Sequence, residues 1–299
     1  MGISIVLLTF NSEANLERTL KAAHTLSRDV HAVDSFSSDG TLSILKKHSV
    51  KVIQRPFENY SAQRNWAIEH LNTENEWQLH LDADELLSAD LVAEIRRELL
   101  APDAADGYYI PRKIRFLERD LNHGGYYPTY HMRLFRRGHA WVEDKIYDQH
   151  FVLTGRGKKL KSPLIDDHQM SLSEWTTRHN RWSDFESEEL LGLNPAVHDP
   201  ASRKVVQPSI FGNVLERKRA RKEGYLKLPL LIRPFGLFIY RYIFRLGFLD
   251  GKAGLVYCVL QAFWFRFLID AKCYEAKKAE DRRQKRFEED VHIFGQLVK

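Results

Sequence analysis

Short apolar runs alternate with segments of helical spacing over the first hundred residues. The runs at 3–8, 30–33, 50–53 and 77–81 are rich in Ile, Val and Leu. The near-continuous run at 3–8 is typical of a strand buried on both faces of a parallel sheet, and the other three runs also predict strands. Between them, segments that begin after Ser12, at Thr41 and near Tyr60 predict helices, with Ser12 as an N-cap. The pattern predicts an α/β fold with a mostly parallel sheet flanked by helices.

Polar side chains gather where the predicted strands end. In open α/β sheets ligands bind outside the carboxyl ends of the strands, so these side chains are candidates for a nucleotide site. Asp34 would accept a hydrogen bond from base or ribose, and Arg64 would meet a diphosphate; singly, each is equally explained as a turn former or an ion pair. No Walker loop or Gly-x-Gly-x-x-Gly motif follows the first strand, which disfavours P-loop and dinucleotide folds. The candidate nucleotide-binding residues are Thr9, Phe10, Asn11, Glu13, Asp34, Ser35, Asp39, Arg64, Asp82 and Ala83.

The run at 77–81 leads directly into an Asp-x-Asp motif, Asp82-Ala83-Asp84. In an extended segment residues i and i+2 point to the same side, so the two carboxylates can converge on one cation. Mg²⁺ and Mn²⁺ take oxygen ligands from one or two carboxylates and from substrate phosphates. The alternative is a solvated acidic turn, and the neighbouring polar clusters favour the metal.

Four segments together resemble the successive blocks of an inverting family 2 glycosyltransferase with a GT-A fold. They are ISIVLLTFNSEANLERTL, AVDSFSSDGTLSI, RPFENYSAQRNWAI and WQLHLDADELL, within residues 3 to about 100. The resemblance implies a Rossmann-like GT-A sheet, a nucleotide-diphosphate sugar donor (UDP by expectation) and Mg²⁺ or Mn²⁺. It also points to the bacterial enzymes that build lipopolysaccharide core or surface polysaccharide.

The resemblance extends the predicted metal site beyond Asp82 and Asp84. Relatives carry a His/Asp cluster before a Leu-Ser-x-Trp helix, and Asp166-Asp167-His168 precedes a similar segment here. We therefore expect Asp82, Asp84 and His168 as metal ligands, with Asp166 or Asp167 as alternatives to His168.

Three carboxylates in the segment 141–148 are candidates for a general base. Inverting transfer needs one base to take the proton of the acceptor hydroxyl, while metal and diphosphate stabilise the leaving group. The relatives carry a hydrophobic-His-Glu triplet whose acid is the base, and Ile146-Tyr147-Asp148 stands in its place. The order of candidates is Asp148, Asp144 and then Glu143.

The C-terminal third differs in charge from the rest of the chain. Residues 201–252 hold twelve Lys/Arg and three Asp/Glu, a net charge of +9, whereas the remainder totals −4. Two apolar, aromatic runs at 226–240 and 255–269 are interrupted by Arg, which suits helices in the lipid headgroup region. The alternative is a helical subdomain that packs on the catalytic core. We expect a catalytic domain at 1–170 and a basic, amphipathic helical region at 171–299, whose residues 275–290 form a charged helix.

These features favour an enzyme over a binding protein. The leading hypothesis is a metal-dependent inverting glycosyltransferase that transfers a hexose to a lipid-linked saccharide or lipopolysaccharide. The alternatives are a polyprenyl-phosphate glycosyltransferase and a basic nucleic-acid- or lipid-binding protein with an inactive α/β domain. The apolar runs lack the basic–aromatic alternation of a strand-binding groove, so no nucleic acid is expected.

The expected location is the cytoplasmic face of the bacterial inner membrane, as a peripheral, monotopic protein on anionic lipid. No leader segment is expected, because the chain begins directly in a strand-like run. No uncharged apolar stretch reaches the ~18 residues of a simple transmembrane helix. The two cysteines, Cys258 and Cys273, suggest neither a disulfide framework nor a metal site.

Overall fold

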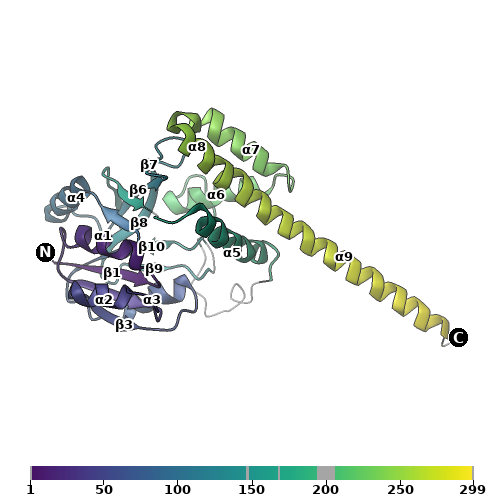
Figure 1. The fold of residues 1–299 in the computed structure, drawn as a ribbon, viewed down its shortest axis with the longest axis horizontal. Coiled ribbons are helices and arrows are strands. Elements are labelled where there is room, and N and C mark those ends of the chain that lie inside the picture. Colours follow the sequence, from purple (N-terminus) through teal and green to yellow (C-terminus); the bar gives the residue numbers. More distant parts are fainter. Residues whose placement is uncertain (1, 146–147, 168, 194–205, 298–299) are drawn as a thin grey trace.

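The computed structural model describes residues 2–145, 148–167, 169–193 and 206–297, and it combines one large sheet with a helical C-terminal region (Figure 1). The strands are β1 (Ile3–Thr9), β2 (Val30–Asp34), β3 (Lys51–Gln54), β4 (Trp77–Asp82), β5 (Glu85–Leu87), β6 (Gly107–Phe116), β7 (Arg119–Asp120), β8 (Thr129–Arg136), β9 (Ala140–Val142), β10 (Phe151–Leu153), β11 (Gly157–Lys159) and β12 (Leu164–Asp167). The helices are α1 (Glu13–Ala23), α2 (Thr41–Lys47), α3 (Tyr60–His70), α4 (Ala89–Leu100), α5 (Leu172–Leu190), α6 (Val214–Leu226), α7 (Arg233–Ile239), α8 (Gly251–Tyr257) and α9 (Phe265–Leu297). Shorter π- and 3₁₀-helical segments are η2 (Tyr240–Phe244), η3 (Gly247–Asp250) and η4 (Cys258–Trp264).

The sheet confirms the predicted α/β class. Its strand order is β3-β2-β1-β4-β8-β6-β12-β5, with β7 and β11 also paired to β6. The first four strands in this order are parallel, and β8 runs antiparallel to both β4 and β6. The carboxyl ends of β1, β2 and β4 therefore meet at one edge, where the polar clusters lie.

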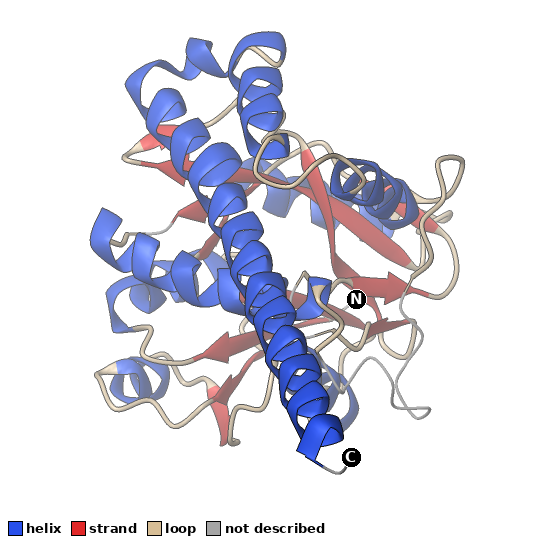
Figure 2. Cartoon of the chain, turned by 90° about the vertical axis from the view of Figure 1, so that its right-hand side faces the viewer, coloured by secondary structure: helices blue, strands red, loops and turns tan. Residues whose placement is uncertain are grey.

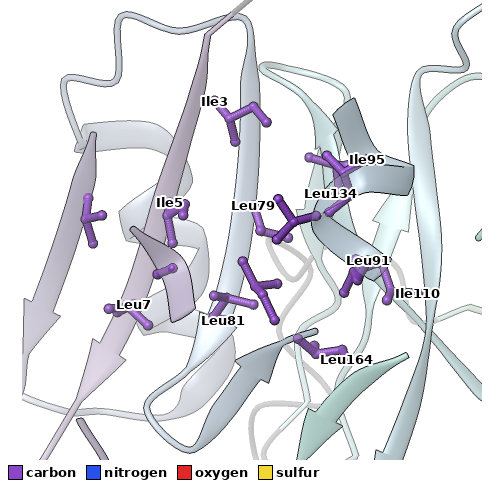
Figure 3. Close-up of a cluster of buried hydrophobic side chains, with 14 of the residues drawn as sticks. Ile3, Ile5, Leu7, Leu79, Leu81, Leu91, Ile95, Ile110, Leu134 and Leu164 are labelled. Carbon is purple, nitrogen blue, oxygen red and sulfur yellow. The ribbon is translucent and has the colours of Figure 1, made fainter. Parts of the chain in front are cut away.

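Alternate residues of β1 face two different helix layers, as the pleat of a strand requires. Ile5 and Leu7 belong to the main core, which α1, α2 and α4 cover (Figure 3). Val6 faces the other way and packs with Ala67 and Leu71 of α3 and its end. Burial on both faces explains why the strand lacks polar alternation.

The N-caps follow local hydrogen bonding. Asn59 and Ser88 accept from backbone N–H groups of α3 and α4, and Ser171 forms a capping box with Glu174 on α5. Ser12 stands at the predicted N-cap position of α1, but its side chain does not cap the helix. Its hydroxyl instead donates to the Phe10 carbonyl, because the chain turns sharply there to meet the loop after β2.

One part of the helical region packs on the sheet, and another part projects away from it. Tyr257 and Cys258 cluster with Phe116 and Tyr126, so the second apolar run contacts the catalytic part. The helices α8, η4 and α9 follow one another without a break, and α9 projects away from the body (Figures 1 and 2). The charged helix expected at 275–290 lies within α9.

The segment Gly247–Glu288 is long and apolar enough to cross a membrane, judged by length and composition alone. We expected no such helix because we looked for an apolar run without any charge. This helix contains an 18-residue stretch that is apolar but not free of charged residues. Of this stretch, 44% is buried inside the structure. The core helix of a protein outside a membrane can pass the same test.

Large apolar side chains remain exposed along the helical region between residues 228 and 259, and we name this set the apolar face. It consists of Leu228, Ile232, Phe235, Ile239, Tyr240, Ile243, Phe244, Leu246, Phe248, Leu249, Leu255 and Val259.

Candidate active site

The loops after β1 and β2 are joined by hydrogen bonds. Asp34 is buried, and Thr9 Oγ1, Ser37 N and Gln54 Nε2 donate to its carboxylate at 2.9–3.0 Å. Burial would raise the pKa of Asp34, but the hydrogen bonds from Ser37, Gln54 and Thr9 hold it below its ordinary value. Asp34 thus orders the loop with internal donors, and the expected hydrogen bond from a nucleotide to Asp34 stays a prediction.

The exposed edge of these two loops is a rim formed by Phe10, Asn11, Glu13 and Asp39. Gly40 N donates to Glu13 Oε2 at 2.8 Å, and Glu13 N donates to Asp39 Oδ2 at 3.1 Å. Asn11 Oδ1 accepts from Ser38 N at 2.9 Å, with Asn11 itself in the left-handed region at φ 45°. Phe10 is 61% exposed beside them, so its ring is available to a ligand.

The Asp-x-Asp motif forms the tight turn between β4 and β5. Asp82 ends β4, and its two oxygens pair with different arginines, Arg64 from α3 and Arg133 from β8, the latter at 2.6 Å. Arg133 also pairs with Glu85 at 2.7 Å, and Glu85 accepts from Asp82 N at 2.9 Å. Arg64 is therefore a buried support for Asp82, and its expected contact with diphosphate stays a prediction.

The charges of this turn balance one another. Enclosure would raise the pKa of Asp82, but Arg133 and Arg64 hold it well below its ordinary value. Burial and the nearby charge of Asp82 raise the pKa of Glu85 to about 7, against the opposing effect of Arg133. The arrangement keeps Asp82 ionised at the sheet edge.

The turn supplies hard oxygen ligands that suit Mg²⁺ or Mn²⁺. Within the described part of the chain, no three His, Cys, Asp or Glu side chains gather into a metal site. Asp82 and Asp84 would hold such an ion together with phosphate oxygens of a bound substrate. The expected third ligand, His168, lies outside the described residues.

A cavity of about 880 Å³ opens beside the turn. Thr19 Oγ1 donates to the Ala83 carbonyl at 2.8 Å and Asp167 N to the Asp84 carbonyl at 3.1 Å, so α1 and β12 hold the turn's backbone. Arg18 pairs with Asp167 at 2.5 Å, and both line the cavity. Asp166 is buried and pairs with Arg112 at 3.3 Å.

The three candidate bases have different surroundings. Glu143 is fully buried and is bound by Arg219 and by His150 Nδ1, the latter at 3.1 Å. Burial would raise the pKa of Glu143, but His150 and Arg219 hold it below its ordinary value. Asp144 is half-buried, and Asp148 keeps 23% of its side-chain surface exposed. Glu143 therefore supports the segment, whereas Asp144 and Asp148 remain partly exposed.

The basic helix α6 supplies site residues that the sequence analysis missed. Lys218, Arg219 and Lys222, here named the α6 cation cluster, all contact Asp148. Arg217 and Arg221 stay exposed on the opposite side. Together with the buried Leu215, the cluster follows helical spacing, which was the available signal. We had expected the basic C-terminal third to meet anionic lipid, but three of its cations face the catalytic part.

The strand order and the position of the carboxylate turn agree with a fold of the GT-A type. A model of the glycosyl transferase family 2 matches residues 4–160, and the chain belongs to this family. The chain is 37% identical over 93 residues to an uncharacterized glycosyltransferase of Rickettsia typhi, covering 31% of each, and 32% identical over 115 residues to one of Rickettsia bellii, covering 38% of each. A mannosyltransferase from Pyrobaculum calidifontis has the same fold, with a TM-score of 0.51 and 14% identity over 91% of this chain and 86% of that one. The chain thus matches only about a third of the curated relatives' length.

We predict that Arg133→Met destabilises the protein by about 3 kcal/mol, since it leaves Glu85 and Asp82 adjacent without their shared cation. Urea unfolding followed by circular dichroism measures the change. Arg97→Met is the control, because the Arg97 side chain is 70% exposed and its pair with Glu94 is long, at 3.9 Å. Equal stability of both variants would contradict the central role of Arg133.

Proposed function

We propose that the protein is a metal-dependent inverting glycosyltransferase. It transfers a hexose from a nucleotide-diphosphate sugar, with UDP the expected nucleotide, to a lipid-linked saccharide or lipopolysaccharide. The observation that carries the proposal is the Asp82–Asp84 turn at the carboxyl edge of the sheet, held by Arg64 and Arg133 in a family 2 chain. The mannosyltransferase of similar fold was determined with GDP-Man and Mn²⁺, which accords with such a donor and ion.

The proposed roles follow the geometry of the edge. The nucleotide lies against the rim made by Phe10, Asn11 and the loop that Asp34 and the buried Thr9 order. Asp82 and Asp84 hold the metal, which when bound neutralises charge on the leaving diphosphate. The acceptor hydroxyl attacks the anomeric carbon as the bond to phosphate breaks, and its proton passes to Asp148. A single displacement inverts the configuration and needs no enzyme nucleophile.

We further propose that the apolar face binds the cytoplasmic surface of a membrane. Its side chains are exposed together, and Lys227, Arg245 and Lys252 are exposed among them. Apolar side chains with interspersed cations suit the headgroup region of anionic lipid. On α8 and η4, Leu255 and Val259 are exposed while Tyr257 and Cys258 pack on the catalytic part, so one helical stretch can make both contacts.

We predict that the protein binds one nucleotide sugar in the presence of Mn²⁺. The Asp84→Ala variant should lose the increase in donor affinity that Mn²⁺ causes. Calorimetric titration with UDP-, GDP- and dTDP-sugars, with and without Mn²⁺, provides the measurement. Asp90→Ala, at an exposed carboxylate six residues further on, is the control and should bind normally. A folded wild-type protein that binds no donor under any condition would refute the proposal.

We predict that Asp148→Asn lowers kcat by roughly 10²–10⁴, the usual contribution of a general base, while donor binding persists. Single-turnover transfer assays measure this, with Asp144→Asn as the comparison. Near-normal transfer by Asp148→Asn would instead favour a polyprenyl-phosphate acceptor, whose phosphate oxygen is already ionised and needs no base.

We predict that the double variant Ile232→Ser/Phe244→Ser weakens binding to anionic vesicles by on the order of 100-fold. The two side chains are 68% and 72% exposed, and burying each in an apolar phase contributes about 1.5–3 kcal/mol. Vesicle flotation measures the binding. Leu100→Ser, at a 73% exposed site in the catalytic part, serves as the control. Unaltered binding by the double variant would exclude the apolar face as the contact.

A further inference from the structure

We propose that the α6 cation cluster is a phosphate-binding site, separate from the Asp82–Asp84 turn, which Asp148 occupies until a substrate phosphate replaces it. This inference rests on the proposed function for its substrate and not for its geometry. Lys218, Arg219 and Lys222 converge on one carboxylate from a single helix face. Such convergence of cations on one point is the arrangement that holds a phosphate.

Asp148 fills this site loosely. Its carboxylate oxygens lie 3.3–3.5 Å from the cationic groups of the cluster, beyond the 2.7–2.9 Å of well-formed charge-assisted hydrogen bonds. Its backbone has φ 53°, in the left-handed region that few non-glycine residues adopt. The closest contact is made by the Asp148 carbonyl, which accepts from Arg219 at 2.9 Å. A phosphate, with more oxygens than a carboxylate, can satisfy three cations at shorter distances.

The charges around the cluster favour an anion in this position. Glu143 pairs with Arg219, and Glu186 pairs with both Lys222 and Arg266 at 2.9 Å. Counting these groups and Asp148, four cations face three carboxylates. Withdrawal of Asp148 leaves an excess of two positive charges, which matches the charge of a phosphate monoester.

His150 completes the surroundings as a neutral group. Its Nε2 lies 2.7 Å from Lys218 Nζ and 3.6 Å from an Asp148 oxygen. Burial and the neighbouring Lys218 lower the pKa of His150, so the imidazole adds no positive charge at neutral pH. Lys218 donates to it and keeps its remaining protons for an anion.

The position of the site connects the catalytic turn with the apolar face. The His150 ring stacks on His131 of β8 at 6.3 Å between centroids, and Arg133, two residues further along β8, binds Asp82. At its other end α6 stops at Leu226, just before the apolar face begins at Leu228. A phosphate here belongs either to the donor diphosphate or to a phosphorylated acceptor that arrives from the membrane. In both cases its binding releases Asp148 toward the reacting centre.

Calorimetric titration of the full chain with inorganic phosphate, in EDTA, tests the site without metal or turnover. We expect the wild type to bind phosphate weakly, because Asp148 occupies the cluster in most molecules. If the occupied state holds ~90% of the population, its removal by Asp148→Asn tightens phosphate binding about tenfold. Lys218→Gln/Lys222→Gln should lose binding. Arg217→Gln/Arg221→Gln removes the same charge from the exposed side of α6 and should bind like the wild type.

Two results would overturn the proposal, provided that thermal unfolding shows the variants folded. One is unchanged phosphate affinity in Asp148→Asn, and the other is equal loss in the inward and outward double variants, which indicates a merely basic helix. Repeating the titration with saturating UDP and Mn²⁺ distinguishes the sources. Competition by UDP assigns the site to the donor diphosphate, whereas independent binding assigns it to an acceptor phosphate. Because donor binding is tested separately through Asp84, either proposal can fail while the other stands.

Discussion

The ion pairs around Asp82 are the constraint on which the catalytic edge depends. Asp82 and Glu85 stand three residues apart in a tight turn, and two carboxylates there would repel each other without buried cations. Arg64 comes from α3 and Arg133 from β8, so the turn takes its shape only when helix, strand and turn are assembled. The strand that carries Arg133, β8, lies beside the four parallel strands and runs antiparallel to both of its neighbours, β4 and β6. The geometry of the proposed metal site is thus a property of the assembled sheet.

A second group of ion pairs connects the helical region to this edge. Glu143 and Asp148 follow β9, and their cations come from α6, more than sixty residues later. Glu186 on α5 and Arg266 on α9 extend the same network. The helical region is therefore a structural part of the candidate active site as well as an appendage. A division of the chain at residue 170 describes the order of the elements, since β12 ends at Asp167 and α5 begins at Leu172, but the charge network crosses it.

The positive charge of the C-terminal third has two separate uses in this arrangement. The α6 cation cluster faces carboxylates of the catalytic part, and exposed Lys227, Arg245 and Lys252 accompany the apolar face. The two structural alternatives for the apolar runs are compatible for the same reason. A helix has opposite sides, and one side packs on Phe116 and Tyr126 while the other stays exposed. A basic, apolar sequence can thus pack on the catalytic part and also present an exposed apolar surface.

Local patterns in the sequence determined the first four strands, the α/β class, the family and the position of the Asp82–Asp84 turn, because apolar runs and strand-end chemistry are read from neighbouring residues. Arg64 was also found by its motif, but its partner was not, since an ion pair to Asp82 depends on how α3 crosses the strand. Only the tertiary structure decided that Arg133 is shared by Asp82 and Glu85, that Glu143 is buried and that α6 turns three cations toward Asp148. These pairings join residues 48 to 76 positions apart, and no local period of hydrophobic and polar residues encodes which distant charges will meet.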